Sequence, residues 1–134
     1  MRACVIYESM FGNTEKIARS LAGGLSCAMT RATTRHEAHQ QGAPLGDDDR
    51  GLREFIDELP SALRTPIAVF DTRVSTVRKL PGSAAKAAAK ELLRHHDRVV
   101  ARASFYVEDT SGPLLDGEVD RAAGWGRELA ASQS

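Results

Sequence analysis

Cysteine is scarce in this sequence, and neither sign of charge is in excess. Cys4 and Cys27 are the only cysteines among the 134 residues, without a Cys-x-x-Cys pair, which argues against a disulfide scaffold or a closed zinc module. The 18 basic residues balance 18 acidic ones, so a nucleic-acid partner is not expected. No uncharged apolar run approaches the roughly 18 residues of a membrane span. The sequence therefore predicts a cytoplasmic protein without membrane or nucleic-acid partners.

The length favours a single domain. A chain of 134 residues suits one domain of roughly 100–150 residues and is too short for two ordinary ones. We expect one domain over residues 1–134, with an irregular connection at 26–50 and a tail at 131–134.

The N-terminal region has the pattern of a strand, a loop and a helix. Residues 3–7 form an unbroken apolar run, which is typical of a strand covered on both faces. From Thr14, apolar residues recur at helical spacing, and Thr14 can cap the helix start. These residues are Ile17, Ala18, Leu21, Ala22 and Leu25.

Two further strand-helix units follow. Strands are predicted near 66–71 and 98–107, with a loop from Asp71 to Lys79 and helices over residues 84–96 and around 119–129. A short amphipathic helix is predicted at residues 52–59. With the first unit this gives three strands, near 2–7, 66–71 and 98–107, and four helices. Alternating strands and helices favour a parallel sheet.

The segment at residues 26–50 differs from the rest of the chain. It contains no Val, Ile, Phe, Tyr or Trp, and a complete strand-helix-strand unit needs roughly 30 residues or more. We therefore expect an irregular connection here that supplies no buried strand.

The loop at residues 9–14, SMFGNT, lies where an anion can bind. Backbone N–H groups and the positive end of a helix converge between a strand and the helix that follows it. Neither a Walker loop nor a GxGxxG fingerprint is present. The alternative is that these residues only turn the chain and cap a helix.

Residues 5–14, VIYESMFGNT, resemble the first strand and phosphate loop of flavodoxin-like proteins. In that family a Ser/Thr-x-Thr-Gly-x-Thr loop holds the phosphate of FMN, and Phe11 stands here in place of a hydroxyl residue. Residues 70–73, 80–85 and 105–110 are similar to the later half of short flavodoxin-like domains. The resemblance implies a flavodoxin-like three-layer α/β/α fold with a reduced parallel sheet.

The resemblance also implies an internal deletion. The family orders five strands 2-1-3-4-5, and this chain looks as though it lacks the second strand, the second helix and the third strand. Residues 27–31 resemble the loop that follows the third strand. We expect the first strand to pair with the strand at 66–71, or else to leave an open edge that invites a homodimer.

The resemblance assigns cofactor-binding residues at two places. The phosphate of FMN would lie on the first loop, and the flavin ring near three residues at the end of the predicted strand at 66–71. Met29 would remain from the loop that forms the other wall of the flavin site in the family. The residues are Ser9, Met10, Phe11, Gly12, Asn13 and Thr14, then Asp71, Thr72 and Arg73. The predicted function is electron transfer through FMN to a redox partner protein, with no catalytic acid, base or nucleophile. The alternative is a degenerate module that binds no flavin and acts through protein association.

Other residues have plainer interpretations. Cys4 is expected in the core and Cys27 in a loop, both non-catalytic. His36 and His39 are expected on the solvated surface without a metal. Asp47, Asp48 and Asp49 are expected to cap a helix. Trp125 is expected to pack in the core.

Overall fold

The computed structural model describes residues 3–8, 11–25, 28–32, 56–59, 65–77 and 83–133. These residues form a mixed α/β protein. Its elements, in chain order, are β1 (Cys4–Glu8), α1 (Asn13–Leu25), β2 (Ala28–Ala32), β3 (Ile67–Val74), the 3-10 turn η1 (Ser75–Val77), α4 (Ala84–Arg94), β4 (Val99–Val107) and α5 (Glu118–Gln133). Residues 56–58 form a helical turn.

The strands pair in parallel, in two separate pairs. β1 pairs with β2, where Val5 lies opposite Met29, and β3 pairs with β4, where Thr72 lies opposite Phe105. Among the described strands no ladder joins the two pairs. The predicted pairing of the first strand with the strand at 66–71 is therefore wrong: β1 pairs with β2, the segment that follows α1, and β3 pairs with β4.

β2 also corrects the prediction for residues 26–50. Ala28–Ala32 is a strand, where the sequence predicts an irregular connection that resembles a loop. The segment AMTRA has little intrinsic strand preference, but a neighbouring strand can supply the hydrogen bonds that such a segment needs, since strand formation depends strongly on context. Residues 33–50 lie outside the described residues, as do Cys27, His36, His39 and the three aspartates.

The remaining predicted elements are confirmed, with changes at their ends. β3 continues to Val74, so residues 71–74 belong to a strand and not to a loop. α4 has Ser83 as its N-cap, with the Ser83 hydroxyl accepting from the Lys86 N–H, and His95 as its C-cap. α5 extends to Gln133, so residues 131–133 continue a helix where a tail is predicted. Only residues 56–59 of the predicted helix at 52–59 are described.

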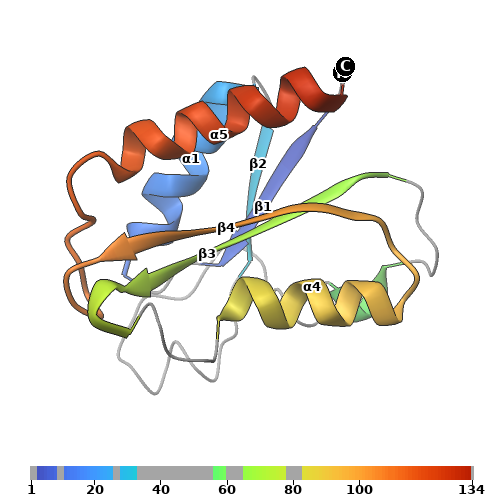
Figure 1. The fold of residues 1–134 in the computed structure, drawn as a ribbon, viewed down its shortest axis with the longest axis horizontal. Helices are drawn as coiled ribbons and strands as arrows, with labels where there is room; N and C mark the ends of the chain where they lie inside the picture. The colour runs from blue at the N-terminus through green and yellow to red at the C-terminus, as the bar shows by residue number, and fades with distance from the viewer. Residues whose placement is uncertain are drawn as a thin grey trace.

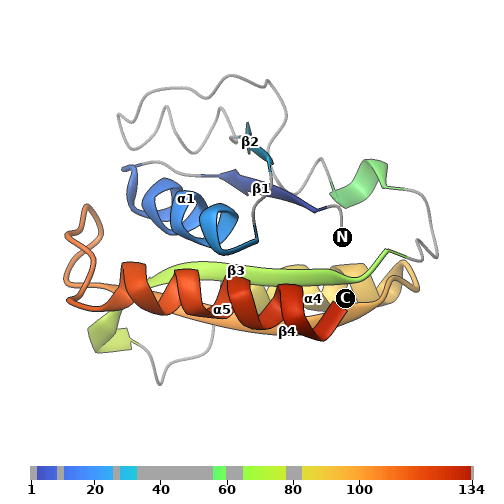
Figure 2. The same ribbon diagram turned by 90° about the horizontal axis from the view of Figure 1, so that it is seen from above.

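Helices cover β3 and β4 from both sides. Figure 1 shows α1 and α5 above the two strands and α4 below them, and Figure 2 shows α1 beside α5 from a second direction. The two helices approach closely at Gly126, because a Cβ atom there would lie 2.6 Å from the Leu21 carbonyl oxygen. Among the described helices none is long and apolar enough to cross a membrane.

Phe105 lies at the centre of the core between α1, β4 and α5. It is fully buried together with Ile17 and Ala122. Its ring meets those of Phe70 and Trp125 edge to face, with centroids 6.4 Å and 6.0 Å apart. The predicted packing of Trp125 against the core is confirmed.

Two further clusters complete the core. One joins β1 to α1 through Val5, Tyr7 and Leu21, and the other joins α4 to β3 and Ile56. Cys4 is exposed, which makes its predicted place in the core wrong. The physical reason is the alternation of side chains along β1, which buries Val5 and Tyr7 on one face and turns Cys4 to the other.

Glu118 ties the start of α5 to β4. Its carboxylate accepts from the Tyr106 N–H at 2.8 Å and from Arg121 Nε at 2.9 Å. This hydrogen-bonded carboxylate raises the pKa of Arg121 above its ordinary value, so the guanidinium stays charged over the ring of Phe105, 4.4 Å from its centroid.

Candidate functional site

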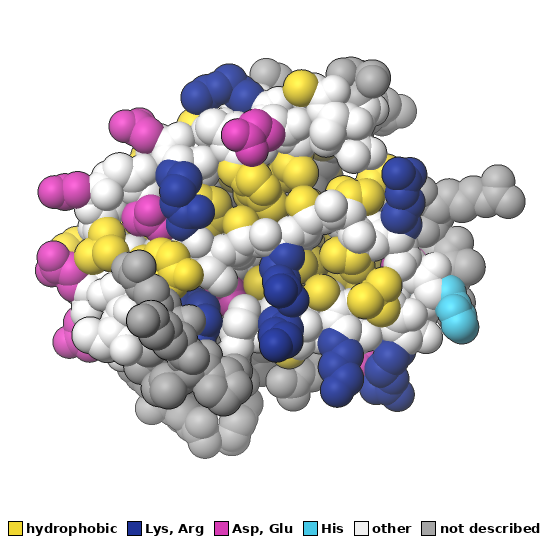
Figure 3. Space-filling view, in the orientation of Figure 1, with side chains coloured by type: hydrophobic (Ala, Val, Ile, Leu, Met, Phe, Trp, Pro, Cys, Tyr) yellow, Lys and Arg dark blue, Asp and Glu magenta, His cyan; other side chains and the backbone are white. Residues whose placement is uncertain are grey.

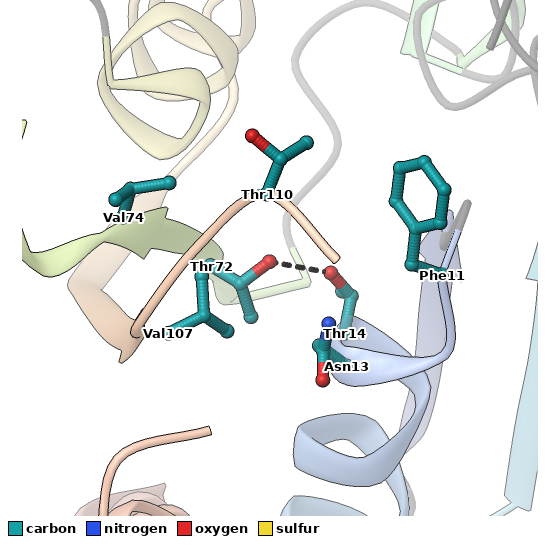
Figure 4. A pocket seen from close by; sticks show the side chains of 7 residues that line it. All are labelled: Phe11, Asn13, Thr14, Thr72, Val74, Val107 and Thr110. Atoms are coloured by element: carbon teal, nitrogen blue, oxygen red, sulfur yellow. Dashed lines mark hydrogen bonds between the residues drawn. The ribbon is translucent and has the colours of Figure 1, made fainter. Parts of the chain in front are cut away.

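A pocket lies where the carboxyl ends of β3 and β4 meet the N-terminus of α1 (Figure 4). Its volume is about 190 Å³. The described residues that line it are Phe11, Asn13, Thr14, Thr72, Val74, Val107 and Thr110. Ligands of open α/β sheets lie at this edge of the sheet, so the pocket is the candidate functional site.

A hydrogen bond between two threonines joins the two halves of the pocket. The hydroxyl oxygens of Thr14 on α1 and Thr72 on β3 lie 2.7 Å apart, across 58 residues of sequence, and Figure 4 shows the two side chains facing each other. The structure therefore brings together the first loop and one of the three residues predicted after the second strand.

This contact corrects the predicted cap of α1. Thr14 is the second residue of the helix, and its hydroxyl bonds to Thr72 instead of a backbone N–H of the first turn. The first helical hydrogen bond is donated by the Lys16 N–H to the Gly12 carbonyl oxygen. Gly12 is thus the residue directly before the helix, and it has a φ of +86°, which disfavours most other residues.

Asn13 is the first residue of α1, and its side chain packs against the loop that follows β4. Only 7% of its surface is exposed. Gly112 packs against it so closely that a Cβ atom there would lie 2.7 Å from Asn13 Oδ1. The side chain that lines the pocket is therefore positioned by a glycine about a hundred residues away in sequence.

The pleat of β3 separates the three residues that are predicted to lie near a flavin ring. Thr72 and Val74 line the pocket, whereas Asp71 points toward α4. Its Oδ2 accepts from the Ser83 hydroxyl at 2.5 Å and from the Ala85 N–H at 2.9 Å. Asp71 is only 5% exposed and holds the start of a helix, and it is not among the described residues that line the pocket.

Arg73 is also absent from the described lining of the pocket. Alternate residues of a strand point to opposite faces, which separates Arg73 from its neighbours Thr72 and Val74. Of the three residues from 71 to 73, only Thr72 therefore reaches the candidate site.

The other predicted site residues are distributed as follows. Phe11 lines the pocket and is 42% exposed. Met29 lies in β2, opposite Val5. Ser9 and Met10 lie outside the described residues.

Three lining residues were not expected from the sequence. Val74 follows the predicted end of its strand, and Val107 and Thr110 lie at the end of β4 and in the turn after it. The rule that parallel strands deliver site residues from their carboxyl ends is the signal that could have identified Val107 and Thr110.

The described lining is uncharged and combines polar side chains with the apolar Phe11, Val74 and Val107. Three threonine hydroxyls and one amide can donate hydrogen bonds, and the N-terminus of α1 adds its positive dipole end. Glu15 in the first turn of α1 is hydrogen-bonded by the Tyr7 hydroxyl at 3.2 Å and by Arg19 at 2.9 Å, which partly neutralises the one acidic residue of that turn. The pocket is thus suited to a small anion.

No model of a known protein family matches the chain, and a search of curated proteins finds no match.

Proposed function

We propose that this chain is a cytoplasmic flavodoxin-like protein with a three-layer α/β/α arrangement, which binds FMN and transfers electrons to a partner protein. The observation that carries the proposal is the Thr14–Thr72 hydrogen bond of 2.7 Å. It joins the start of α1 to the carboxyl end of β3, which is where a phosphate loop and a ring-binding strand have to meet. The resemblance of residues 5–14 to a flavodoxin phosphate loop supports the same assignment.

The residues present fit the phosphate end of FMN. Asn13, Thr14, Thr72 and Thr110 offer neutral donors around the N-terminus of α1, and helix N-termini bind phosphate without a lysine when the backbone and dipole contribute. The flavin, when bound, supplies the electron chemistry. The protein's part is to hold the phosphate and to exclude water from the apolar side formed by Val74 and Val107.

The size of the pocket limits what it encloses. Pockets that bury most of a drug-sized ligand measure about 300–1,000 Å³, and this one measures about 190 Å³. The pocket therefore has room for the phosphate and the adjoining polyol chain but not for the whole of FMN.

The test compares FMN with riboflavin, which lacks the phosphate. Purified protein should either absorb between roughly 350 and 500 nm, as oxidised flavin does, or quench FMN fluorescence on titration. FMN should bind at least about tenfold more tightly than riboflavin, which corresponds to roughly 1.4 kcal/mol of phosphate contacts. Colourless protein that quenches neither flavin would contradict the proposal.

A second candidate is a flavodoxin-like module without flavin that acts through protein association, including a homodimer. It is favoured by the two strand pairs, which present separate edges in the described part of the chain, since an open edge can pair with another chain. Light scattering on the purified protein separates the candidates. A dimer that carries no flavin and ignores added FMN would favour the second one.

A further inference from the structure

Three potential metal ligands meet at the end of α4, away from the pocket. One ligand atom from each of Asp57, Glu91 and His95 lies within 4.8 Å of the other two. Glu91 is in the last turn of α4, His95 is its C-cap, and Asp57 belongs to the helical turn at residues 56–58. In Figure 1 this end of α4 is opposite the arrowheads of β3 and β4. The cluster is therefore separate from the candidate site at the carboxyl ends of those strands.

The spacing of Glu91 and His95 suits two ligands of one ion. Glu91 Oε1 and His95 Nε2 are 3.8 Å apart, which is too long for a hydrogen bond. Zinc bonds of about 2.0–2.2 Å at the tetrahedral angle place two ligand atoms of the same ion roughly 3.3–3.6 Å apart, so a shift of a few tenths of an ångström brings the two atoms to this distance. The other carboxylate oxygen, Glu91 Oε2, accepts from Arg94 Nη1 at 3.0 Å, so Arg94 orients the carboxylate with Oε1 toward His95.

Both segments that carry the ligands are fixed by the core. Ile56, next to Asp57, is buried in a cluster with Ala89 and Leu92 of α4. The backbone N–H of His95 donates to the carbonyl oxygens of Glu91 and Leu92. The three ligands thus come from two packed segments, and an ion between them would cross-link the turn at 56–58 to α4.

Among the described residues, the His95 imidazole lies at ion-pair distance from Glu91, 3.8 Å, and makes no hydrogen bond through Nδ1. Its Nδ1 is buried and has no hydrogen-bond partner among the described residues, while the side chain keeps 23% of its surface exposed. In Figure 3 histidine atoms reach the surface at the end of the molecule where α4 ends; of the two described histidines, His96 is exposed and His95 is half-buried. An ion in solution can therefore reach this end of the protein.

We propose that Asp57, Glu91 and His95 form a zinc-binding site that cross-links the helical turn at 56–58 to the end of α4. One imidazole and two carboxylates are a donor set that zinc accepts, whereas Mg²⁺ and Ca²⁺ prefer oxygen ligands throughout. Three protein ligands leave the fourth tetrahedral position to water. The ion holds the turn in place, because it binds only when both segments are folded together.

The first experiment titrates Zn²⁺ into the metal-free full-length protein by calorimetry. We expect one site per chain, whose affinity falls at least about tenfold in His95→Gln, since even the loss of an outer contact to a metal ligand costs 10–100-fold. The matched control is His96→Asn, which changes the neighbouring histidine and tolerates its φ of 61°. Asp57→Asn changes an exposed residue, so it tests a second ligand without risk to the core.

The outcomes separate this site from other donors in the chain. Loss of affinity in His95→Gln and Asp57→Asn, but not in His96→Asn, supports the proposal. Equal Zn²⁺ affinity in all four proteins would assign the ion to other side chains and overturn it, as would the absence of binding at sub-millimolar Zn²⁺.

A second measurement tests the cross-link and the choice of metal. Zn²⁺ should raise the melting temperature of the unmodified protein and of His96→Asn, because binding to the folded state alone stabilises it, and should leave that of His95→Gln unchanged. Mg²⁺ at the same concentration should have no such effect. An equal rise with Mg²⁺ would contradict a site chosen by its imidazole.

Discussion

The hydroxyl oxygens of Thr14 and Thr72 lie 2.7 Å apart and join α1 to the carboxyl end of β3. Neither residue has another hydrogen bond through its side chain among those observed in the described residues. The pair therefore links two elements that otherwise meet mainly through apolar packing below the pocket.

A double-mutant cycle measures what this hydrogen bond contributes. Thr14→Val and Thr72→Val each keep the shape of the side chain and remove the hydroxyl, and each should lower the free energy of unfolding by about 0.5–1.5 kcal/mol. The double variant should lose less than the sum, because both single variants break the same bond. Urea unfolding gives the three values. Thr110→Val, which also lines the pocket, is the control, and strict additivity of the pair would show that the bond is not made in solution.

Residues 71–73 illustrate that a strand can be predicted from the sequence but the position of its end cannot. The apolar run at 66–70 predicts a strand, and β3 confirms it. The end of that strand is not encoded in the run itself. The position of the end decides whether Asp71 and Arg73 lie in a loop or on the face of the strand opposite to Thr72. Asp71 becomes a helix-anchoring residue only because Ser83 and the Ala85 N–H come to it from α4.

α1 could be predicted from the sequence, whereas β2 could not. The spacing of Ile17, Ala18 and Leu21 is sufficient to predict α1, because helical periodicity is local. β2 has no such local signal, and it exists through the hydrogen bonds of its neighbour β1. The partner of Thr14 could not be predicted either, since it lies 58 residues away.

Asp71 should matter for stability and not for anion binding. Asp71→Ala leaves the buried Ala85 N–H without its acceptor, which should cost on the order of 1–3 kcal/mol. The affinity for phosphate or FMN should stay within about twofold of the unmodified protein, since a buried carboxylate that faces α4 makes no contact in the pocket; a tenfold change would require 1.4 kcal/mol. Unfolding in urea and FMN titration of the same variant test both parts. A tenfold loss of FMN affinity in folded protein would restore Asp71 to the site.

Gly12 should be replaceable by asparagine but not by valine. Its φ is +86°, and no atom lies within 4 Å of a Cβ placed there, so any cost comes from the backbone and not from crowding. A β-branched residue at positive φ should cost roughly 1–3 kcal/mol, whereas asparagine tolerates this region. Thermal unfolding of Gly12→Val and Gly12→Asn compares them directly. Equal melting temperatures would mean that the loop relaxes to a different conformation.

Gly112 offers the sharpest test of how the pocket is held. Both Gly112 and Gly117 have positive φ, +102° and +83°, but only Gly112 faces another group, the side chain of Asn13. Alanine at either position should cost on the order of 1–3 kcal/mol in backbone strain. Gly112→Ala should also push Asn13 out of place, since its Cβ would stand 2.7 Å from Oδ1 and 2.8 Å from Nδ2.

We expect Gly112→Ala to weaken phosphate or FMN binding at least about fivefold, roughly 1 kcal/mol, and to unfold more readily than Gly117→Ala. Gly117→Ala carries the strain without the contact, so it should keep the anion affinity of the unmodified protein. Titration of both variants with phosphate and with FMN distinguishes the effects. If the two variants lose affinity equally, backbone strain after β4 and not the position of Asn13 controls the pocket.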